Sequence, residues 1–279
     1  MSSLAIDNIG SLVTNEPTLG GEGELGVLRA AAVVFEDGEV VAVEPAGVEA
    51  DALVDAGGRC VMPGFVDSHT HLVFAGDRSA EFAARMAGAP YEAGGIRATA
   101  EATRAASAVE LERLALARRA EGLRAGITHV EIKSGYGLDV ASEAKSCEVA
   151  ARLTDDVTFL GAHVVPAEFE SEPDAYVELV RGEMLAACAP LCRWIDAFCE
   201  TGAFTAEQCR AVLEAGRAAG LGLRLHGNQL GPGEGVRLAV ELDAASVDHC
   251  TYLTDADVEA LAGSRTVATF LPATDFSTR

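Results

Sequence analysis

Lysine is scarce in this sequence. Only Lys133 and Lys145 are lysines among 21 basic residues, which face 43 acidic ones, and the formal net charge is −22. Such a balance argues against the broad basic surface that binds nucleic acid or anionic membranes, so we expect neither as a partner. Screening limits the repulsion of an anionic substrate by distant charges beyond about 8 Å at physiological salt. A local arginine would therefore decide whether an anion binds.

Long apolar runs and paired cysteines are also lacking. No apolar stretch reaches the roughly 20 residues of a membrane span, and the N-terminus has no basic segment followed by an apolar one. The seven cysteines show no Cys-x-x-Cys spacing. Cys188, Cys192, Cys199 and Cys209 fall in helical or strand patterns, so we expect them reduced and buried. These features predict a soluble cytoplasmic protein.

Residues 1–58 predict a small β-domain, here incomplete. The segment from Val27 to Val43 alternates apolar and polar residues and breaks at Asp37-Gly38, a strong two-residue hairpin signal. Gly20–Gly23 predicts a loop. We expect a small N-terminal β-sandwich that precedes the main domain.

From residue 59 to residue 279, strand and helix patterns alternate, which favours a parallel sheet with crossover helices. The helices have N-cap signals at Ser107, Asp139, Thr205 and Thr254. The first strand starts near Cys60 and is expected to be buried, with His69 and His71 at its C-terminal end. The other predicted strands cover residues 127–133, 157–163, 194–199, 221–226, 245–249 and 266–271. The pattern predicts an α/β fold, a (β/α)₈ TIM-type barrel with seven of its eight strands.

Five of the six histidines lie at or just beyond predicted strand ends, the face where such barrels build their active sites. A lone His-x-His pair can be a surface accident, but five such positions together predict a metal centre. We propose His69, His71 and His226 as ligands of one Zn²⁺ or iron ion, since three protein ligands plus water typify a catalytic metal. His249 suits proton transfer. His129, inside a strand, is expected to be structural.

Other polar residues accompany the histidines. Arg78 follows His71 on a glycine-containing loop and can hold a substrate carboxylate, although an exposed surface arginine is the alternative. Tyr136 lies between Gly135 and Gly137, where its hydroxyl can reach a ligand. Strand alternation places Arg224 on the same face as His226, where it would need an acidic partner.

Seven stretches combine into a more specific pattern: Pro63–Phe74 with Arg78, Thr103–Ser107, Lys133–Gly137, Gly161–His163, Glu200–Phe204, Ser246–His249 and Leu271–Phe276. Together they resemble the imidazolonepropionases, amidohydrolase-superfamily enzymes of histidine degradation. His-x-His is a superfamily feature, whereas Lys-Ser-Gly-Tyr-Gly with the Arg78 loop is specific to this family.

The resemblance implies metal-dependent hydrolysis of the cyclic amide of 4-imidazolone-5-propanoate to N-formimidoyl-L-glutamate, with one zinc or iron ion. It implies that His69, His71 and His226 bind the metal and that Arg78, Tyr136 and His163 contact the small anionic substrate. His249 corresponds to the histidine beside the nucleophile. A homodimer is left open as the oligomeric state.

Two departures from the family pattern bear on catalysis. Family members often carry an acidic residue just after the fifth-strand histidine, where this chain has Gln229. An amide cannot act as a general base, so Gln229 is expected to take part in catalysis by a hydrogen bond to the ligand. Proton transfer is then left to His249 or to an aspartate of an eighth strand. The family also continues into an eighth strand with a metal-binding aspartate. We therefore expect this chain to be C-terminally truncated and, alone, poorly folded with negligible activity.

Two alternatives stay open. Another amidohydrolase, acting on a different cyclic amide or on a nucleobase, would share the metal histidines but not the family-specific loops. An inactive metal-binding remnant would bind metal without turnover.

Overall fold

The computed structural model describes residues 2–88 and 94–278. They form two compact units, Met1–Phe65 and Val66–Arg279. Met1 and Arg279, the outer limits of the two predicted domains, lie outside the described residues. Each unit has its own hydrophobic core.

The N-terminal unit contains one five-stranded sheet in the order β3-β2-β1-β4, with β5 also paired to β1. Its strands are β1 (Ser3–Val13), β2 (Val27–Glu36), β3 (Glu39–Pro45), β4 (Ala52–Asp55) and β5 (Cys60–Val61), and a short 3₁₀ turn covers Pro17–Leu19. The predicted hairpin is confirmed: Asp37 and Gly38 join β2 to β3 with φ values of +51° and +85°. The predicted sandwich is not confirmed.

The second unit is built on a curled parallel sheet in the order β13-β12-β11-β10-β9-β8. Consecutive strands are neighbours, as expected when each helical crossover returns the chain to the next position. The strands are β8 (Ile132–Lys133), β9 (Val157–Ala162), β10 (Trp194–Cys199), β11 (Gly222–Gly227), β12 (Ser246–His249) and β13 (Val267–Thr269). This half-barrel brings the carboxyl ends of its strands to one face.

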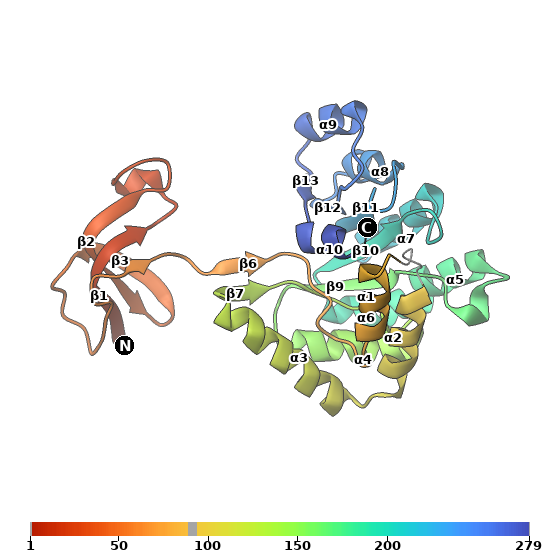
Figure 1. Ribbon diagram of the computed structural model, residues 1–279, viewed down its shortest axis with the longest axis horizontal. Helices are drawn as coiled ribbons and strands as arrows, with labels where there is room; N and C mark the ends of the chain where they lie inside the picture. The colour runs from red at the N-terminus through yellow and green to blue at the C-terminus, as the bar shows by residue number, and fades with distance from the viewer. Residues whose placement is uncertain (1, 89–93, 279) are drawn as a thin grey trace. The chain divides into compact units, whose positions relative to one another are not determined.

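Helices connect these strands and cover them (Figure 1). They are α1 (Ser79–Met86), α2 (Gly94–Ala105), α3 (Ala108–Arg124), α4 (Val140–Ala151), α5 (Pro173–Leu179), a π-helical turn (Val180–Met184), α6 (Leu185–Cys188), α7 (Ala206–Ala218), α8 (Gly235–Glu241), α9 (Asp255–Ala262) and α10 (Pro272–Thr278), with 3₁₀ turns at Ala167–Phe169 and Ala189–Leu191. The four predicted N-caps are confirmed, because each side chain accepts a hydrogen bond from the N–H three residues later.

The prediction for the first barrel strand is wrong in two respects. The strand, β6 (Phe65–Asp67), is short and pairs with β7 (Ile127–Val130) in a separate two-stranded sheet. Phe65 and Val66 are 55% and 63% exposed, so the strand is not buried. His69 and His71 follow it in irregular chain. There the Thr70 carbonyl accepts the Lys133 N–H, and Thr70 makes two further bonds to Glu131, through its N–H to the carboxylate and its hydroxyl to the carbonyl.

Two smaller differences follow from local geometry. The predicted strand 127–133 is interrupted at Glu131, whose N–H donates to the Asp67 carbonyl and separates β7 from β8. All seven cysteines are free, but Cys192 is only half-buried because it lies in the turn before β10.

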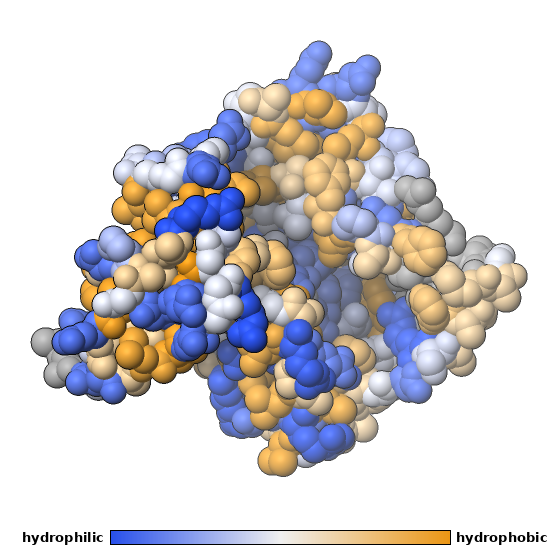
Figure 2. Space-filling view, turned by 60° about the vertical axis from the view of Figure 1, so that its left-hand side comes forward, coloured by the Kyte–Doolittle hydropathy of each residue, from blue (hydrophilic) through white to orange (hydrophobic). Residues whose placement is uncertain are grey.

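The surface mixes apolar and polar side chains, as Figure 2 shows for one face. Exposed apolar residues such as Val40, Leu123 and Val267 are distributed along the chain. None of the described helices has the length and apolar character needed to cross a membrane.

Two helical glycines differ sharply in what surrounds them and provide a test of packing. A Cβ at Gly216 in α7 would overlap the buried Ile195 side chain of β10, whereas a Cβ at Gly182 would meet nothing within 4 Å. We expect Gly216→Ala to lower the free energy of unfolding by about 1–3 kcal/mol through overpacking. Gly182→Ala should raise it by up to about 1 kcal/mol through helix propensity. Denaturant unfolding measures both, and equal effects would contradict the close contact between α7 and β10.

Candidate metal centre

Five histidines gather at the carboxyl face of the half-barrel. The ring centroid of His69 lies 4.6 Å from that of His226 and 5.3 Å from those of His71 and His249. His163 stacks on His71 at 5.3 Å. His129, which we expected to be structural, lies outside this cluster, with its Nε2 3.4 Å from the Asp156 carboxylate.

The cluster can hold a cation. Ligand atoms of His69, His226 and His249 lie within 4.8 Å of one another. His71, predicted as a ligand, is outside that group of three, but its Nε2 is 3.4 Å from Nε2 of His226. Two neutral rings that face each other through nitrogen lone pairs repel unless a proton or a cation lies between them. The donor set, imidazole nitrogens on buried rings, fits zinc or iron.

Burial keeps four of these rings, those of His69, His71, His163 and His249, neutral. Desolvation, with the nearby Lys133 ammonium, lowers the pKa of His69 to about 4. Desolvation is also the main cause that lowers the pKa of His163 to about 3 and that of His249 to about 2. The pKa of His71 lies well below its usual value for the same reason. Neutral imidazole is the form that binds metal.

Two buried carboxylates lie within 3 Å of the Nδ1 atoms of two of these rings. Asp248 Oδ2 in β12 is 2.7 Å from His69 Nδ1, and Asp196 Oδ2 in β10 is 2.9 Å from His226 Nδ1. Such contacts orient a ring and leave its Nε2 available to a metal. The sequence analysis assigned no role to either aspartate, although an Asp within the buried runs Trp194–Cys199 and Ser246–His249 was a usable signal.

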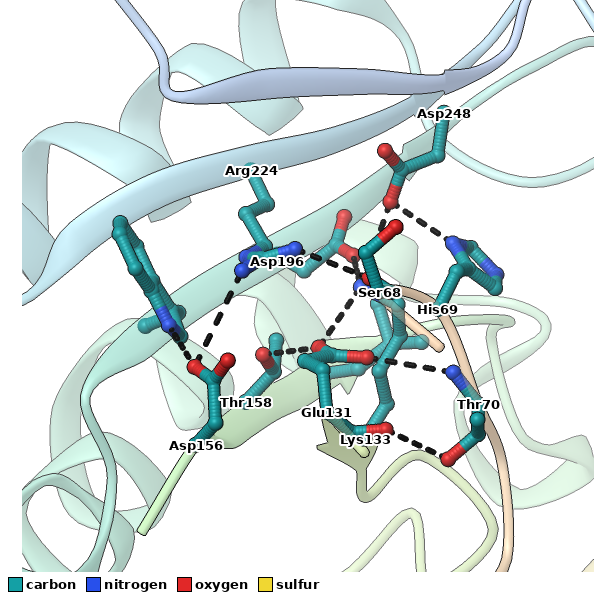
Figure 3. A network of polar contacts seen from close by, with 12 residues as sticks. Ser68, His69, Thr70, Glu131, Lys133, Asp156, Thr158, Asp196, Arg224 and Asp248 are labelled. Atoms are coloured by element: carbon teal, nitrogen blue, oxygen red, sulfur yellow. Dashed lines mark hydrogen bonds and ion pairs between the residues drawn. The ribbon is translucent and has the colours of Figure 1, made fainter. Parts of the chain in front are cut away.

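The fully buried ammonium of Lys133 lies among three carboxylates (Figure 3). Its Nζ is 2.9 Å from Asp196 Oδ2, 3.0 Å from Glu131 Oε1 and 3.4 Å from Asp248 Oδ2. Burial alone would lower the pKa of Lys133, but the carboxylates outweigh it and raise that pKa. Asp196, His226 and Asp248 also form a group with metal-binding spacing. Because the lysine already supplies the cation there, the histidine group is the better candidate.

Arg224 has the acidic partner that the sequence analysis required. Its guanidinium lies 3.9 Å from the Asp156 carboxylate and donates to the Ser68 carbonyl at 3.0 Å (Figure 3). It also lies 4.5 Å from the Trp194 ring centroid. Arg224 therefore ties the segment before His69 to the sheet.

A cavity of about 480 Å³ adjoins the histidines. Arg78 and Tyr136, both predicted to bind substrate, line it, and Tyr136 connects it to the cluster because its ring lies 5.3 Å from His163 and 5.7 Å from His71. The remaining lining residues are Phe74, Gly76, Asp77, Ser79, Phe82, Thr99 and Arg118. The guanidinium of Arg118 is engaged by the carbonyls of Leu72 and Phe74.

A buried glutamate, which the sequence analysis missed, shapes the Tyr136 loop. The Glu143 carboxylate accepts backbone N–H bonds from Gly135, Gly137 and Leu138 at 2.7–2.9 Å. Desolvation, and secondarily Cys147, raises the pKa of Glu143 to about 7. The Gly135 carbonyl is in turn 2.9 Å from His163 Nδ1. Gly135 thus connects Glu143 to His163, through its N–H on one side and its carbonyl on the other.

The two residues predicted to be catalytic occupy different surroundings. His249 ends β12 with a left-handed backbone, φ +78°, and its ring lies 5.2 Å from that of His226. Left-handed backbone at a residue other than glycine is often stored strain at a functional site. Gln229 is half-buried in the loop after β11, and its backbone N–H donates to the Glu200 carboxylate at 2.9 Å.

Comparisons with solved structures identify the fold. A triazine hydrolase from Arthobacter aurescens superposes with a TM-score of 0.68 at 15% identity, over the whole chain and 67% of its own. An atrazine chlorohydrolase mutant from Arthrobacter aurescens, complexed with zinc and atraton, gives a TM-score of 0.64 at 16% identity, over 99% of this chain and 67% of its own. The chain has the amidohydrolase fold.

Comparisons with curated proteins are more specific, although no family model matches the chain. The imidazolonepropionase of Salinispora tropica is 62% identical over the whole chain and 72% of its own length. Those of Mycolicibacterium smegmatis and Streptomyces coelicolor are each 61% identical, again over the whole chain and over 71% and 72% of their lengths. At this identity and coverage the chain belongs to the imidazolonepropionase family.

Proposed function

We propose that this chain carries the metal-dependent hydrolysis of 4-imidazolone-5-propanoate to N-formimidoyl-L-glutamate, a step of histidine degradation. The observation that carries the proposal is that Tyr136 lies between a cluster of buried histidines and a cavity lined by Arg78. Full-length relatives at about 60% identity bear the name of this activity. We further infer that the curled sheet is part of a (β/α)₈ barrel and that the N-terminal sheet is part of a β-sandwich.

His69, His71 and His226 would hold one zinc or iron ion. The Nδ1 contacts of His69 and His226 direct Nε2 of each ring away from the aspartates, and His71 Nε2 lies beside that of His226. When bound, the ion would acidify a water molecule and polarise the ring carbonyl of the substrate.

The cavity residues would bind the substrate as an anion. Arg78 can form a two-pronged, charge-assisted contact to the propionate, which a strongly acidic protein needs if it is to hold an anion. The Tyr136 hydroxyl and His163 would contact the imidazolone ring between the cavity and the metal ligands. Gln229 would add a hydrogen bond from the loop after β11.

His249 would move the proton. Its Nδ1 is buried without a hydrogen-bond partner among the described residues, and its low pKa keeps the ring neutral and able to accept. It would take a proton from the attacking water and return it to the ring nitrogen that leaves. Gln229 has an amide and cannot share this role.

Metal analysis of single variants separates ligands from the proton carrier. His71→Ala should lose most of its bound zinc or iron. His249→Ala should keep its metal and lose about 10²–10⁴-fold in kcat, the usual contribution of general acid–base catalysis. His129→Ala, outside the cluster, serves as the control. Metal retained in His71→Ala but lost in His249→Ala would transfer the ligand role to His249, which shares the 4.8 Å group with His69 and His226.

Steady-state kinetics tests the anion contact. Loss of a charge-assisted bond costs about 1.5–3 kcal/mol, or roughly 10- to 150-fold. Arg78→Met should therefore reduce kcat/KM for 4-imidazolone-5-propanoate on that scale while the metal content stays constant. Arg113→Met is the matched control, because Arg113 is exposed on α3 and pairs with Glu110, three residues earlier on the same helix. An unchanged kcat/KM for Arg78→Met would place that arginine outside the substrate site.

A further inference from the structure

The molecule has two lysines, and their surroundings differ in kind. Lys145 donates to the carbonyls of Thr103, Arg104 and Ala106, at the C-terminal end of α2, where a cation is favoured by the helix dipole. Lys133 meets carboxylates instead, and two of these contact metal-site histidines. Lys145 therefore has a structural role, whereas Lys133 is also linked, through two aspartates, to the histidines of the proposed metal site.

A single oxygen in each aspartate is shared between Lys133 and a histidine. Asp196 Oδ2 is 2.9 Å from Lys133 Nζ and 2.9 Å from His226 Nδ1. Asp248 Oδ2 is 3.4 Å from Lys133 Nζ and 2.7 Å from His69 Nδ1. The lysine thus contacts the Asp248 oxygen that is hydrogen-bonded to His69 Nδ1. It also contacts the Asp196 oxygen beside His226 Nδ1, a buried nitrogen that has no hydrogen bond of good geometry among the described residues.

The two aspartates depend on Lys133 to different degrees. Asp196 has further support, because its Oδ1 accepts the backbone N–H of His226 at 3.1 Å. Asp248 Oδ1 is buried without a hydrogen-bond partner among the described residues. The rotation of the Asp248 carboxylate is therefore set by the lysine and by His69. Without the lysine, its charge would lose the cation that compensates burial.

We infer that Lys133 is a positioning residue for the metal centre: its buried ammonium fixes Asp248, which holds His69 as its Nδ1–H tautomer with Nε2 free, and fixes Asp196, which lies against the Nδ1 edge of His226. The inference rests on the proposed metal site. Outer groups of this kind typically contribute 10- to 100-fold to metal affinity. Lys133 itself contacts neither metal nor substrate, and acts through two strands at once, β10 and β12.

The variants must separate this role from stability. Lys133→Met alone leaves three buried carboxylates without their cation and is expected to fold poorly. Lys133→Met combined with Glu131→Gln removes one of those charges, and the amide oxygen can still accept the Thr70 N–H that Glu131 accepts at 3.2 Å. Lys145→Met is the matched control, since it removes the other lysine and its three hydrogen bonds.

Zinc affinity, measured by competition with a chromogenic chelator, is the readout, and thermal melting reports stability. The double variant should bind zinc about 10- to 100-fold more weakly than the wild type. Lys145→Met should lower the melting temperature and keep the wild-type zinc affinity. Wild-type affinity in a folded double variant would overturn the role of Lys133 and leave the metal site standing. A wild-type protein that binds no zinc or iron would overturn both.

The wild-type protein supplies a second measurement if the double variant does not fold. Histidine ¹⁵N spectra of the metal-free protein distinguish the two neutral tautomers. His69 should carry the proton on Nδ1, where Asp248 accepts it, while an Nε2–H form of His69 would contradict the inference.

Discussion

One oxygen in each of two buried carboxylates is shared between an ammonium and an imidazole, and the arrangement of the centre depends on this sharing. Burying the charge of Lys133, Asp196 or Asp248 alone would destabilise the fold. The positive charge of Lys133 compensates the negative charges of both aspartates, and they compensate the lysine. The histidines inherit their orientation from the aspartates. The buried ion pairs inside the sheet therefore help to set the orientation of the His69 and His226 rings at the carboxyl face of the sheet.

The parallel sheet makes this sharing geometrically available. His226 in β11 is in register with Asp248 in β12, and Asp196 lies on the opposite neighbour, β10. Adjacent strands are about 4.8 Å apart, so an ammonium that ends β8 can reach carboxylates from more than one of them as the sheet curls. A flat sheet would place β8 and β12 too far apart for Lys133 to contact Asp248. The curvature of the half-barrel is thus part of the site.

Sequence patterns predicted most of the strands, all four N-caps and the gathering of five histidines, because each depends on local periodicity or on a rule about strand ends. They failed where tertiary contacts decide the outcome. Thr70 anchors the His69 segment to Glu131 through polar bonds that no period of apolar residues reveals. The sequence predicted that Arg224 requires an acidic partner, but it did not identify Asp156 as that partner. Ion pairs between residues far apart in the chain leave no pattern in the spacing of residues.

A further buried acid, Glu143, fixes the loop that contains Tyr136, a residue that lines the cavity. The Glu143 carboxylate accepts three backbone N–H bonds from the loop that contains Tyr136. The carbonyl of Gly135, in the same loop, contacts His163 Nδ1. Gly135 has φ +111°, and a Cβ there would approach His163 Nδ1 to 3.0 Å, so only glycine leaves room for the contact. The Lys-Ser-Gly-Tyr-Gly motif therefore takes part in both networks: its lysine contacts the two aspartates beside His69 and His226, and its glycines donate to the buried Glu143 carboxylate.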